Sequence, residues 1–577
     1  MSLSQSYLAQ PAYGYDMVAS VTQKGINNAI ETYYNDTHTF SAVSFYFIKN
    51  TDGTPLQVDQ SVITSQTGGV DPLSGTAKIP LTQAQINAVK GSNLWFAFNI
   101  YIGNPAGYAG AEYLTINPGS NTVDYYLLCK TLHVAFWNPD NSTWVDILQN
   151  TKEEFNINAT VNLQTVISSN NVTNDVQNGI NYIIKTYNLS STDLNIQQLL
   201  FDADSAVVSP TSTLSGLDSS CSVFTPLMQQ FTKSYFATYL AQAPALDYAV
   251  TQNNTSTLLP TSMSLFTGAL VDSKGNPVPV TKDDAVADLS TINYLFATNG
   301  NTLNAGKQFN WNYLDDNGNS QDPDKDSNAD VNKYDGAIAI NRDAFAKYLG
   351  SRLLPYVMEN CLQPSISVGT DMYQNEWDVD FTQGALEPLA KGFQPFSQSA
   401  VEMDGSDMLL YYASNTSQRS GGWQAADYLS WQNAFELSAV LAGQTLTISQ
   451  TMTVNIDTVW SGNAPGCAAK GTPVNRTYTD VFNIVIDDSG MPCFINTSST
   501  PAHKDDTTAF TPSQPPANII GSLNGLISSL TAGNFDQLPV IMPTTFVFPG
   551  GNAFNFKDAQ FSDNSDLVCH VKYLSEN

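Results

Sequence analysis

The longest regular pattern in the chain alternates apolar and polar residues between positions 445 and 457. The apolar residues fall on even positions, at Leu446, Ile448, Met452, Val454 and Ile456, and hydroxyl, amide or acidic side chains occupy the odd positions. A period of two is typical of a β-strand with one apolar and one polar face, and about a dozen residues is long for a globular strand. The pattern predicts a long antiparallel strand whose apolar face must be covered.

Shorter patterns predict further strands and a smaller number of helices. Apolar runs predict strands at 42–48, 94–102, 125–136 and 477–486, the last returning as a hairpin at 491–495. Apolar residues at helical spacing predict amphipathic helices at 176–187, 224–235 and 519–530. The balance predicts an α+β fold in which antiparallel strands predominate.

Two segments far apart in the chain share the same construction. The run Met17–Val21 reads as a strand, and Thr22 follows it at the cap position of a helix with an apolar stripe. The run Ala337–Ile340 also reads as a strand, with Asn341 at the cap position of a second helix. In both segments a strand leads directly into an amphipathic helix. This repetition predicts two lobes of similar construction.

The most polar stretch of the chain lies between these two segments. It runs from 315 to 335, and we interpret it as an acidic loop or lobe junction. The predicted organisation is an N-terminal lobe at 1–314, this junction at 315–335 and a C-terminal lobe at 336–577. A chain of 577 residues is long enough for two or more cores.

Charge excludes one broad class of function. Charged residues make up only 13% of the chain, and their balance gives a net charge of −29. A protein this acidic is repelled by phosphate backbones and anionic membrane surfaces, so we expect no nucleic-acid partner. We also expect no transmembrane anchoring, because no window approaches 18 uninterrupted apolar residues.

The N-terminus and the cysteines indicate where the protein resides. The first 20 residues contain no Lys or Arg and no continuous apolar run, so no ordinary secretory signal is visible. The six cysteines are scattered, without a C-x-x-C pair, which argues against a disulfide scaffold. We expect a reduced protein that is cytoplasmic or is released by a non-classical route.

Catalytic motifs are absent from the sequence. The four histidines do not fall at a metal-binding spacing, and there is no G-x-S-x-G elbow and no phosphate-binding P-loop. His133 and His570 lie in apolar runs and are expected to be core or edge residues. We therefore predict that the protein is not an enzyme, has no catalytic residues and needs no cofactor.

One acidic stretch resembles a calcium loop. Asp322, Asp324, Asp326 and Asp330 reproduce its early oxygen-donor spacing, D-x-D-x-D-x-x-x-D. However, the turn glycine is replaced by Ser327, and Lys333 stands where the bidentate glutamate belongs. We predict a solvated polar loop and no metal, with calcium binding as the alternative.

Short anchors along the chain resemble one superfamily. They are Gly14–Ile26, Thr291–Leu295, Phe309–Asn312, Ala339–Asp343 and Phe548–Gly551. Within the first anchor, the run Val21–Ile26, which leads from strand into helix, looks like the opening of the tubular lipid-binding (TULIP) proteins. The set as a whole is most similar to the orf-X and P-47-type accessory proteins encoded beside clostridial neurotoxin and insecticidal toxin genes.

The resemblance implies a fold and a function. The fold would consist of strongly curved antiparallel sheets wrapped around long amphipathic helices, with an apolar groove that suits lipid tails. The function would be non-enzymatic binding of a lipid or other hydrophobic ligand, in an accessory role beside other toxin-cluster proteins. A preference for phosphoinositides within that family is not expected for this chain. Its net charge of −29 leaves no obvious basic patch to bind an acidic headgroup.

The candidate ligand lining comes from the predicted long strand and the first predicted helix. We predict that the strand residues named above and Ile26, Ile30 and Tyr33 line the apolar groove. The alternative function is a β-rich pore-forming or insecticidal toxin component, in which the Thr- and Ser-alternating strands would open into a membrane hairpin. Alternating strands are expected in both classes.

Overall fold

The computed structural model describes residues 3–573 with internal gaps. The segments outside the description are 11–12, 36–39, 76–78, 109–112, 152–154, 168–193, 210–211, 243–246, 253–257, 259, 270–286, 299–300, 302, 304–306, 312, 314–333, 361, 372–375, 386–393, 396–405, 422–425, 461–466, 487–491, 504–523, 526–527, 529–536, 540–543 and 548–553. The predicted helices at 176–187 and 519–530 and the anchor at 548–551 fall wholly or mostly in these gaps.

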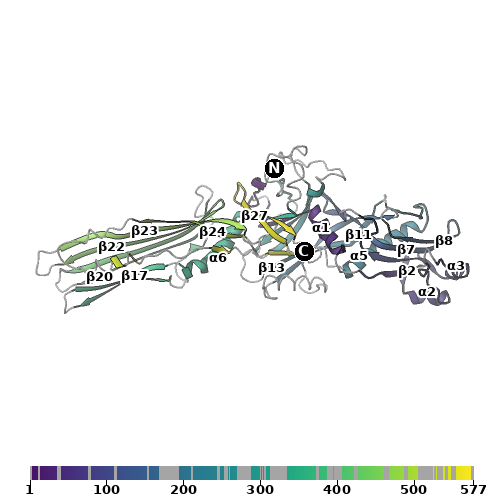
Figure 1. Cartoon of the computed structure of the whole chain (residues 1–577), viewed down its shortest axis with the longest axis horizontal. Coiled ribbons are helices and arrows are strands. Elements are labelled where there is room, and N and C mark those ends of the chain that lie inside the picture. The colour runs from purple at the N-terminus through teal and green to yellow at the C-terminus, as the bar shows by residue number, and fades with distance from the viewer. Residues whose placement is uncertain are drawn as a thin grey trace.

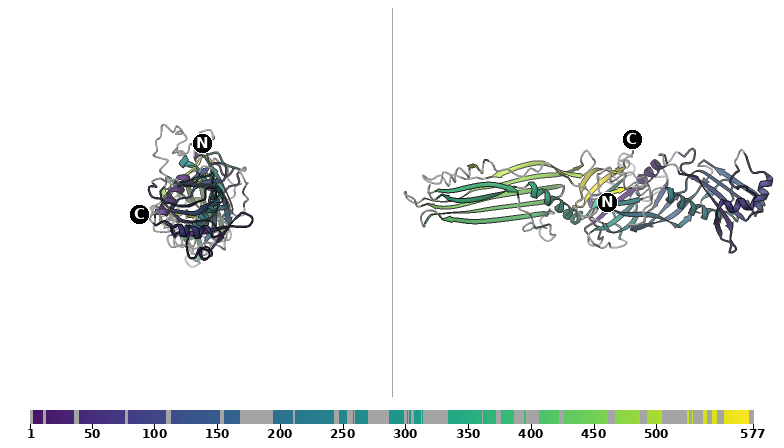
Figure 2. Two further views of the ribbon diagram at one scale, coloured as in Figure 1. Left: turned by 90° about the vertical axis from the view of Figure 1, so that its right-hand side faces the viewer. Right: turned by 90° about the horizontal axis from the view of Figure 1, so that it is seen from below.

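The molecule is elongated, and its antiparallel sheets follow one another along the long axis (Figure 1). Viewed along that axis, it has a narrow cross-section (Figure 2). One end carries the sheet β3-β2-β4-β7-β8, with β2 at Val43–Lys49, β3 at Pro55–Val58, β4 at Leu94–Ile102, β7 at Cys129–Asn138 and β8 at Thr143–Gln149. The described helices are α1 (Gln23–Asn35), α2 (Gln60–Gln66), α3 (Gln83–Lys90), α5 (Phe224–Gln242) and α6 (Arg342–Asn360), and short 3₁₀ turns lie at Leu3–Gln5 and Ala287–Leu289.

The opposite end is built from the longest strands. We call it the long sheet: β19 (Gln394–Pro395), β20 (Ser406–Gly421), β21 (Tyr428–Ala442), β22 (Thr445–Trp460), β23 (Cys467–Ile486), β24 (Pro492–His503) and β25 (Gln537–Pro539), paired in this order. The hairpin of β17 (Leu362–Asp371) and β18 (Glu376–Ala385) contacts it through β21. The predicted long strand is confirmed as β22, whose 16 residues span roughly 50 Å.

Two further sheets occupy the middle of the molecule. One has the order β26-β13-β11-β10-β6-β5, with β26 at Thr544–Val547, β13 at Asp247–Gln252, β11 at Leu194–Val208, β10 at Asn158–Ile167, β6 at Thr122–Tyr126 and β5 at Leu114–Asn117. The other, the central sheet, has the order β14 (Pro260–Gly268), β15 (Thr291–Thr298), β1 (Met17–Thr22), β16 (Gly336–Ile340), β28 (Leu567–Tyr573) and β27 (Phe554–Phe561). A two-residue ladder joins β9 (Phe155–Asn156) to β12 (Thr213–Leu214).

The central sheet places the two similar sequence segments side by side. Strands β1 and β16 pair antiparallel at its centre, with β15 on the outer side of β1 and β28 on the outer side of β16. The main-chain contacts at the two ends of this pair are equivalent. Thr22 N–H donates to the carbonyl of Asp335 at 3.0 Å, and Asn341 N–H donates to that of Asp16 at 2.9 Å. The arrangement is therefore close to two-fold symmetric around the β1–β16 pair.

Both predicted helix caps are confirmed. The Thr22 hydroxyl accepts a hydrogen bond from Gly25 N–H at 2.9 Å, and the Asn341 side chain accepts one from Ala344 N–H at 2.7 Å. Each cap satisfies a main-chain donor that the first turn of its helix leaves unpaired. Gly25 is required by close packing, because a Cβ at that position would lie 2.7 Å from the Asp335 carbonyl oxygen.

The first helix also seals the edge of a neighbouring sheet. Strand β5 lies at the edge of its sheet, and its outward main-chain groups bond to the buried side chain of Asn27. The Asn27 amide oxygen accepts from Tyr113 N–H at 3.1 Å and Leu114 N–H at 2.9 Å, and its nitrogen donates to the Leu114 carbonyl at 3.0 Å. One turn earlier, Gln23 accepts from Ile116 N–H at 2.8 Å. Two amides on one helix face thus replace the missing neighbouring strand.

The predicted fold class is wrong. The described chain is predominantly antiparallel β, and its helices are short, with α5 and α6 the longest at 19 residues each. No long amphipathic helix wrapped by sheets is present among the described residues. Apolar spacing of 3.6 residues correctly predicted α5 within 224–242, but such a pattern shows neither how far a helix extends nor what surrounds it. The domain boundaries at 1–314, 315–335 and 336–577 stay a prediction.

Candidate functional site

The long sheet has one face that is apolar over most of its length, which we call the inner face. It carries the odd-numbered residues of β21, the even-numbered residues of β22 and, from Val474 onward, the even-numbered residues of β23, because paired residues of adjacent strands share a face. Its buried apolar members are Leu429, Trp431, Phe435, Leu437, Ala439 and Leu441 on β21, Leu446, Ile448, Met452, Val454 and Ile456 on β22, and Val474, Tyr478, Phe482 and Ile484 on β23. Three adjacent strands therefore present a largely apolar face, which the polar residues Asn433, Gln450, Arg476 and Asp480 interrupt.

The opposite face of the long sheet is polar and bonded across strands. An amide and hydroxyl ladder crosses four strands: Gln432 Nε2 donates to Asn415 Oδ1 at 3.0 Å, and Asn455 Nδ2 donates to Gln432 Oε1 at 3.1 Å. Thr472 then donates to Asn455 Oδ1 at 2.6 Å. Such cross-strand pairs stabilise register. A shift of the strand register by one residue would move the ladder residues to the apolar face. The ladder therefore helps to fix which residues lie on the inner face.

The structure separates the two groups of predicted lining residues. The five β22 residues lie together on the inner face, all buried. Ile26 and Ile30 are also buried, but they belong to α1, which packs on β1, β5 and β28 near the middle of the molecule (Figure 1). Tyr33 lies in α1, and its side chain is outside the described residues. The assignment of either group as a ligand lining stays a prediction.

A residue that the sequence-based prediction missed interrupts the inner face. Gln450 occupies an even position of β22, between Ile448 and Met452, and its side chain is completely buried. Within the described part of the chain, neither its Oε1 nor its Nε2 atom has a hydrogen-bond partner. The signal was available in the sequence, as the one polar residue in an otherwise apolar series.

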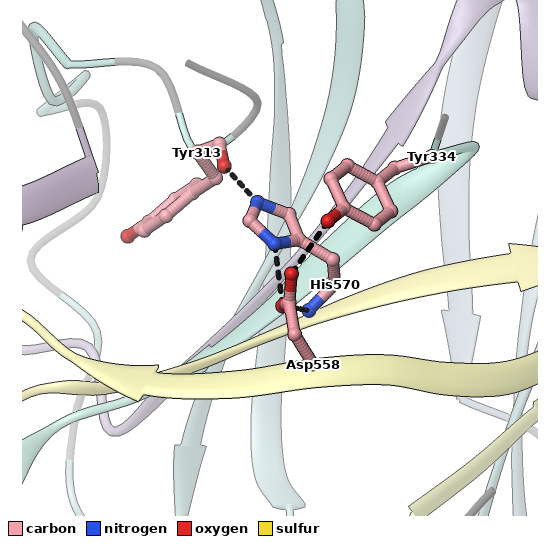
Figure 3. Close-up of polar contacts among 4 residues, drawn as sticks. All are labelled: Tyr313, Tyr334, Asp558 and His570. Carbon is pink, nitrogen blue, oxygen red and sulfur yellow. Dashed lines mark hydrogen bonds and ion pairs between the residues drawn. The ribbon is translucent and has the colours of Figure 1, made fainter. Parts of the chain in front are cut away.

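The described polar groups form a second candidate site in the central sheet (Figure 3). His570 on β28 is completely buried, and its Nδ1 lies 2.6 Å from Asp558 Oδ1 on the paired strand β27. Its Nε2 lies 2.7 Å from the main-chain carbonyl oxygen of Tyr313. The Tyr334 ring stacks on the imidazole, with centroids 4.1 Å apart, and its hydroxyl donates to Asp558 Oδ2 at 2.6 Å. The expectation that His570 is a core residue is confirmed.

The partners of His570 determine what this cluster can do. Burial alone would raise the pKa of Asp558, but the hydrogen bond and charge of His570, with the Tyr334 hydroxyl, hold that pKa below its usual value. The ionised carboxylate and the Tyr313 carbonyl both accept hydrogen bonds, so His570 donates from both nitrogens and is an imidazolium. Neither nitrogen offers a lone pair to a substrate. The cluster links β27 and β28 to the segments that contain Tyr313 and Tyr334.

Asp566 forms another buried anchor, between the N-terminal segment and α6. Its Oδ2 accepts hydrogen bonds from the Ser6 hydroxyl at 2.6 Å and from Leu8 N–H at 2.7 Å, and its Oδ1 accepts from Arg342 N–H at 3.3 Å. Burial raises the pKa of Asp566 to about 6, with a smaller contribution from Asp343, although these three hydrogen bonds oppose the shift. The folded protein therefore binds the proton of Asp566 more tightly than the unfolded chain does.

We expect the Asp566 contribution to stability to decrease as the pH rises. Because the folded pKa is about 6, the contribution is complete below the unfolded value and is lost as the pH passes through 6. Between pH 5 and 7, wild-type protein should lose about 1 kcal/mol relative to Asp566→Asn, whose side chain does not titrate. Denaturant unfolding of both proteins at the two pH values measures this difference. An equal pH dependence in both would contradict the prediction.

The described residues offer no metal site. No group of three or more His, Cys, Asp or Glu side chains among them is placed to hold a metal ion. The calcium-loop candidates Asp322, Asp324, Asp326 and Asp330 lie outside the described residues. Across the segments that the structure describes, no helix combines the length and apolar character needed to cross a membrane.

Comparisons with known proteins add little to this geometry. No protein-family model matches the chain, and no curated protein matches it. Among solved structures, a crystal structure of lipopolysaccharide binding protein aligns with 97% of this chain and 99% of its own, at 10% identity and a TM-score of 0.26. Similarity at that level carries no argument about fold or function. The resemblance to the orf-X and P-47-type proteins stays a prediction.

Proposed function

We propose that the protein binds an apolar ligand, such as a lipid acyl chain, along the inner face of the long sheet and does not act as a catalyst. The observation that carries this proposal is the largely apolar inner face of β21, β22 and β23, opposite a polar face with a bonded ladder. Transfer of an acyl chain from water to such a surface is favourable by about 0.8 kcal/mol per methylene. The binding needs no catalytic group.

The resemblance to toxin-cluster accessory proteins suggests a biological setting for this binding. We propose that the bound ligand serves a toxin system, with other proteins of the same gene cluster as partners. This part of the proposal rests on the short sequence anchors alone. Co-purification of the chain with proteins encoded beside it would test the setting separately from ligand binding.

Trp431 provides a direct test of the proposed surface. It lies on the inner face of β21, opposite Ile456 on β22, and is buried. Bromine atoms quench tryptophan fluorescence only at short range, so dibromostearate bound on this face should quench Trp431 in a saturable manner. Trp431→Phe should remove most of that quenching. Trp95→Phe, on strand β4 at the other end of the molecule, should leave it unchanged.

Extraction and leakage experiments separate the proposal from the pore-forming alternative. Organic extraction of the purified protein, followed by mass spectrometry, should detect a lipid, and vesicles loaded with dye should remain sealed. Leakage that accompanies oligomer formation would instead support a pore-forming protein. Absence of both extracted lipid and saturable quenching would refute the proposed binding.

A further inference from the structure

The inner face of the long sheet contains a buried amide that none of the described residues satisfies. Gln450 lies on β22 (Figure 1) and pairs with Leu437 on β21 and Tyr478 on β23, so all three side chains share this face. Gln450 is completely buried, and both its amide oxygen and its amide nitrogen lack a partner in the described structure. Proteins rarely leave both ends of a buried amide unpaired, because the group loses its water without gaining a replacement.

Polar side chains on the neighbouring strand lie beside this amide. Asp480 pairs with Ile448 and is 3% exposed. Its Oδ1 accepts a hydrogen bond from Asn496 Nδ2 at 3.1 Å, whereas its Oδ2 has no partner among the residues that the structure describes. Asp480 and Gln450 therefore lie on the same face of adjacent strands. They are diagonal neighbours, because Asp480 is two residues beyond Tyr478, the residue that pairs with Gln450.

The third member of this group balances its charge. Arg476 pairs with Met452, on the other side of Gln450, and its Nη1 donates to the Tyr478 hydroxyl at 3.3 Å. One guanidinium and one carboxylate therefore flank the buried amide along β23. We call Gln450, Arg476, Tyr478 and Asp480 the polar cluster, and its formal net charge is zero.

We propose that the polar cluster binds a neutral hydroxyl or amide group of an amphiphile whose apolar chain lies along the inner face. This inference rests on the proposed function and adds the chemical class of the ligand. Gln450 Oε1 and Asp480 Oδ2 accept hydrogen bonds, so the ligand must donate; Gln450 Nε2 donates, so the ligand must also accept. A hydroxyl or an amide does both. A phosphate or carboxylate headgroup would face the Asp480 carboxylate, and the net charge of −29 adds to that repulsion.

Two ligands with the same acyl chain test the proposal. 1-Monooleoylglycerol carries two hydroxyl groups and methyl oleate carries none, so their binding constants differ only through the headgroup. Measured by Trp431 fluorescence, wild-type protein should bind monooleoylglycerol at least roughly tenfold more tightly. Gln450→Leu should abolish this preference, so that monooleoylglycerol and methyl oleate bind with equal affinity. Thr451→Val, the adjacent residue on the polar face, is the matched control and should retain the preference.

The outcomes separate this inference from the proposed function. Binding of neither ligand to wild-type protein would overturn the proposed function and this inference with it. Equal binding of both ligands, or a preference that Gln450→Leu retains, would overturn this inference alone. Gln450→Leu should also raise the melting temperature of the free protein, because it removes an unsatisfied buried amide.

A second variant keeps the test valid if Gln450→Leu fails to fold. Asp480→Asn preserves the shape of the side chain and its contact with Asn496, but it removes the negative charge. It should weaken the preference for monooleoylglycerol and newly permit oleate to bind, because the repulsion of an anionic headgroup is relieved. Unchanged selectivity among the three ligands in Asp480→Asn would overturn the proposal.

Discussion

Asn27→Ala is expected to lower the free energy of unfolding by about 3–5 kcal/mol, which is large for a single substitution. The Asn27 side chain makes three hydrogen bonds to the main chain of the β5 edge and is 2% exposed. Its removal leaves two buried N–H groups and one buried carbonyl without partners. Each such group costs about 1–3 kcal/mol, and water has little access to compensate them.

Denaturant unfolding measures this loss, with Glu31→Ala as the control. Glu31 lies one helical turn further along α1 and is partly exposed, so its replacement by alanine should change stability by less than about 0.5 kcal/mol. Native circular dichroism at low denaturant would establish that the variant folds. Equal midpoints for Asn27→Ala and Glu31→Ala would show that α1 does not seal this sheet edge.

His570→Phe is expected to lower the free energy of unfolding by about 2–4 kcal/mol. The aromatic ring keeps its stack against Tyr334, but Asp558 loses its cationic partner and the Tyr313 carbonyl loses its donor. The remaining carboxylate is partly buried, with its side chain 35% exposed, so part of the cost is relieved by water.

A double-mutant cycle isolates the His570–Asp558 pair. Asp558→Asn in the His570→Phe background should cost less than it does alone, with a coupling energy of about 1–3 kcal/mol. His133→Phe provides the comparison, since His133 is also buried and pairs with an aspartate, Asp146, at 2.7 Å, but among the described residues only one of its ring nitrogens has a partner. A loss for His133→Phe as large as that for His570→Phe would contradict the contribution assigned to the Tyr313 carbonyl.

Local features of the fold could be predicted from the sequence because they depend on neighbouring residues. The alternation around Ile448 predicts a strand because adjacent side chains of a strand point to opposite faces. Thr22 and Asn341 predict helix starts because each bonds to a main-chain group three residues later. Both kinds of signal lie within a few residues of the feature that they determine.

Long-range features could not be predicted in this way. Asn27 bonds to Leu114, 87 residues away, and His570 bonds to Tyr313 across 257 residues. The sequence around Asn27 or His570 does not indicate which distant residue its side chain will contact. The same limitation explains the incorrect fold class, since helical spacing is similar for a short helix packed on a sheet and for a long one inside it. Gln450 is different, because its break in the apolar series is visible in the sequence.

The order of strands in the central sheet determines when that sheet can be completed during synthesis. Strand β1, near the start of the chain, pairs with β15 and β16, and the sheet is closed by β27 and β28 at residues 554–573. A ribosome adds roughly 5–20 residues per second, so β1 waits on the order of half a minute to two minutes for its sheet to be finished. Strand β1 gains both neighbouring strands by residue 340, but β16 lacks its partner β28 until the end of the chain, so a nascent chain stalled before residue 554 should depend strongly on chaperones.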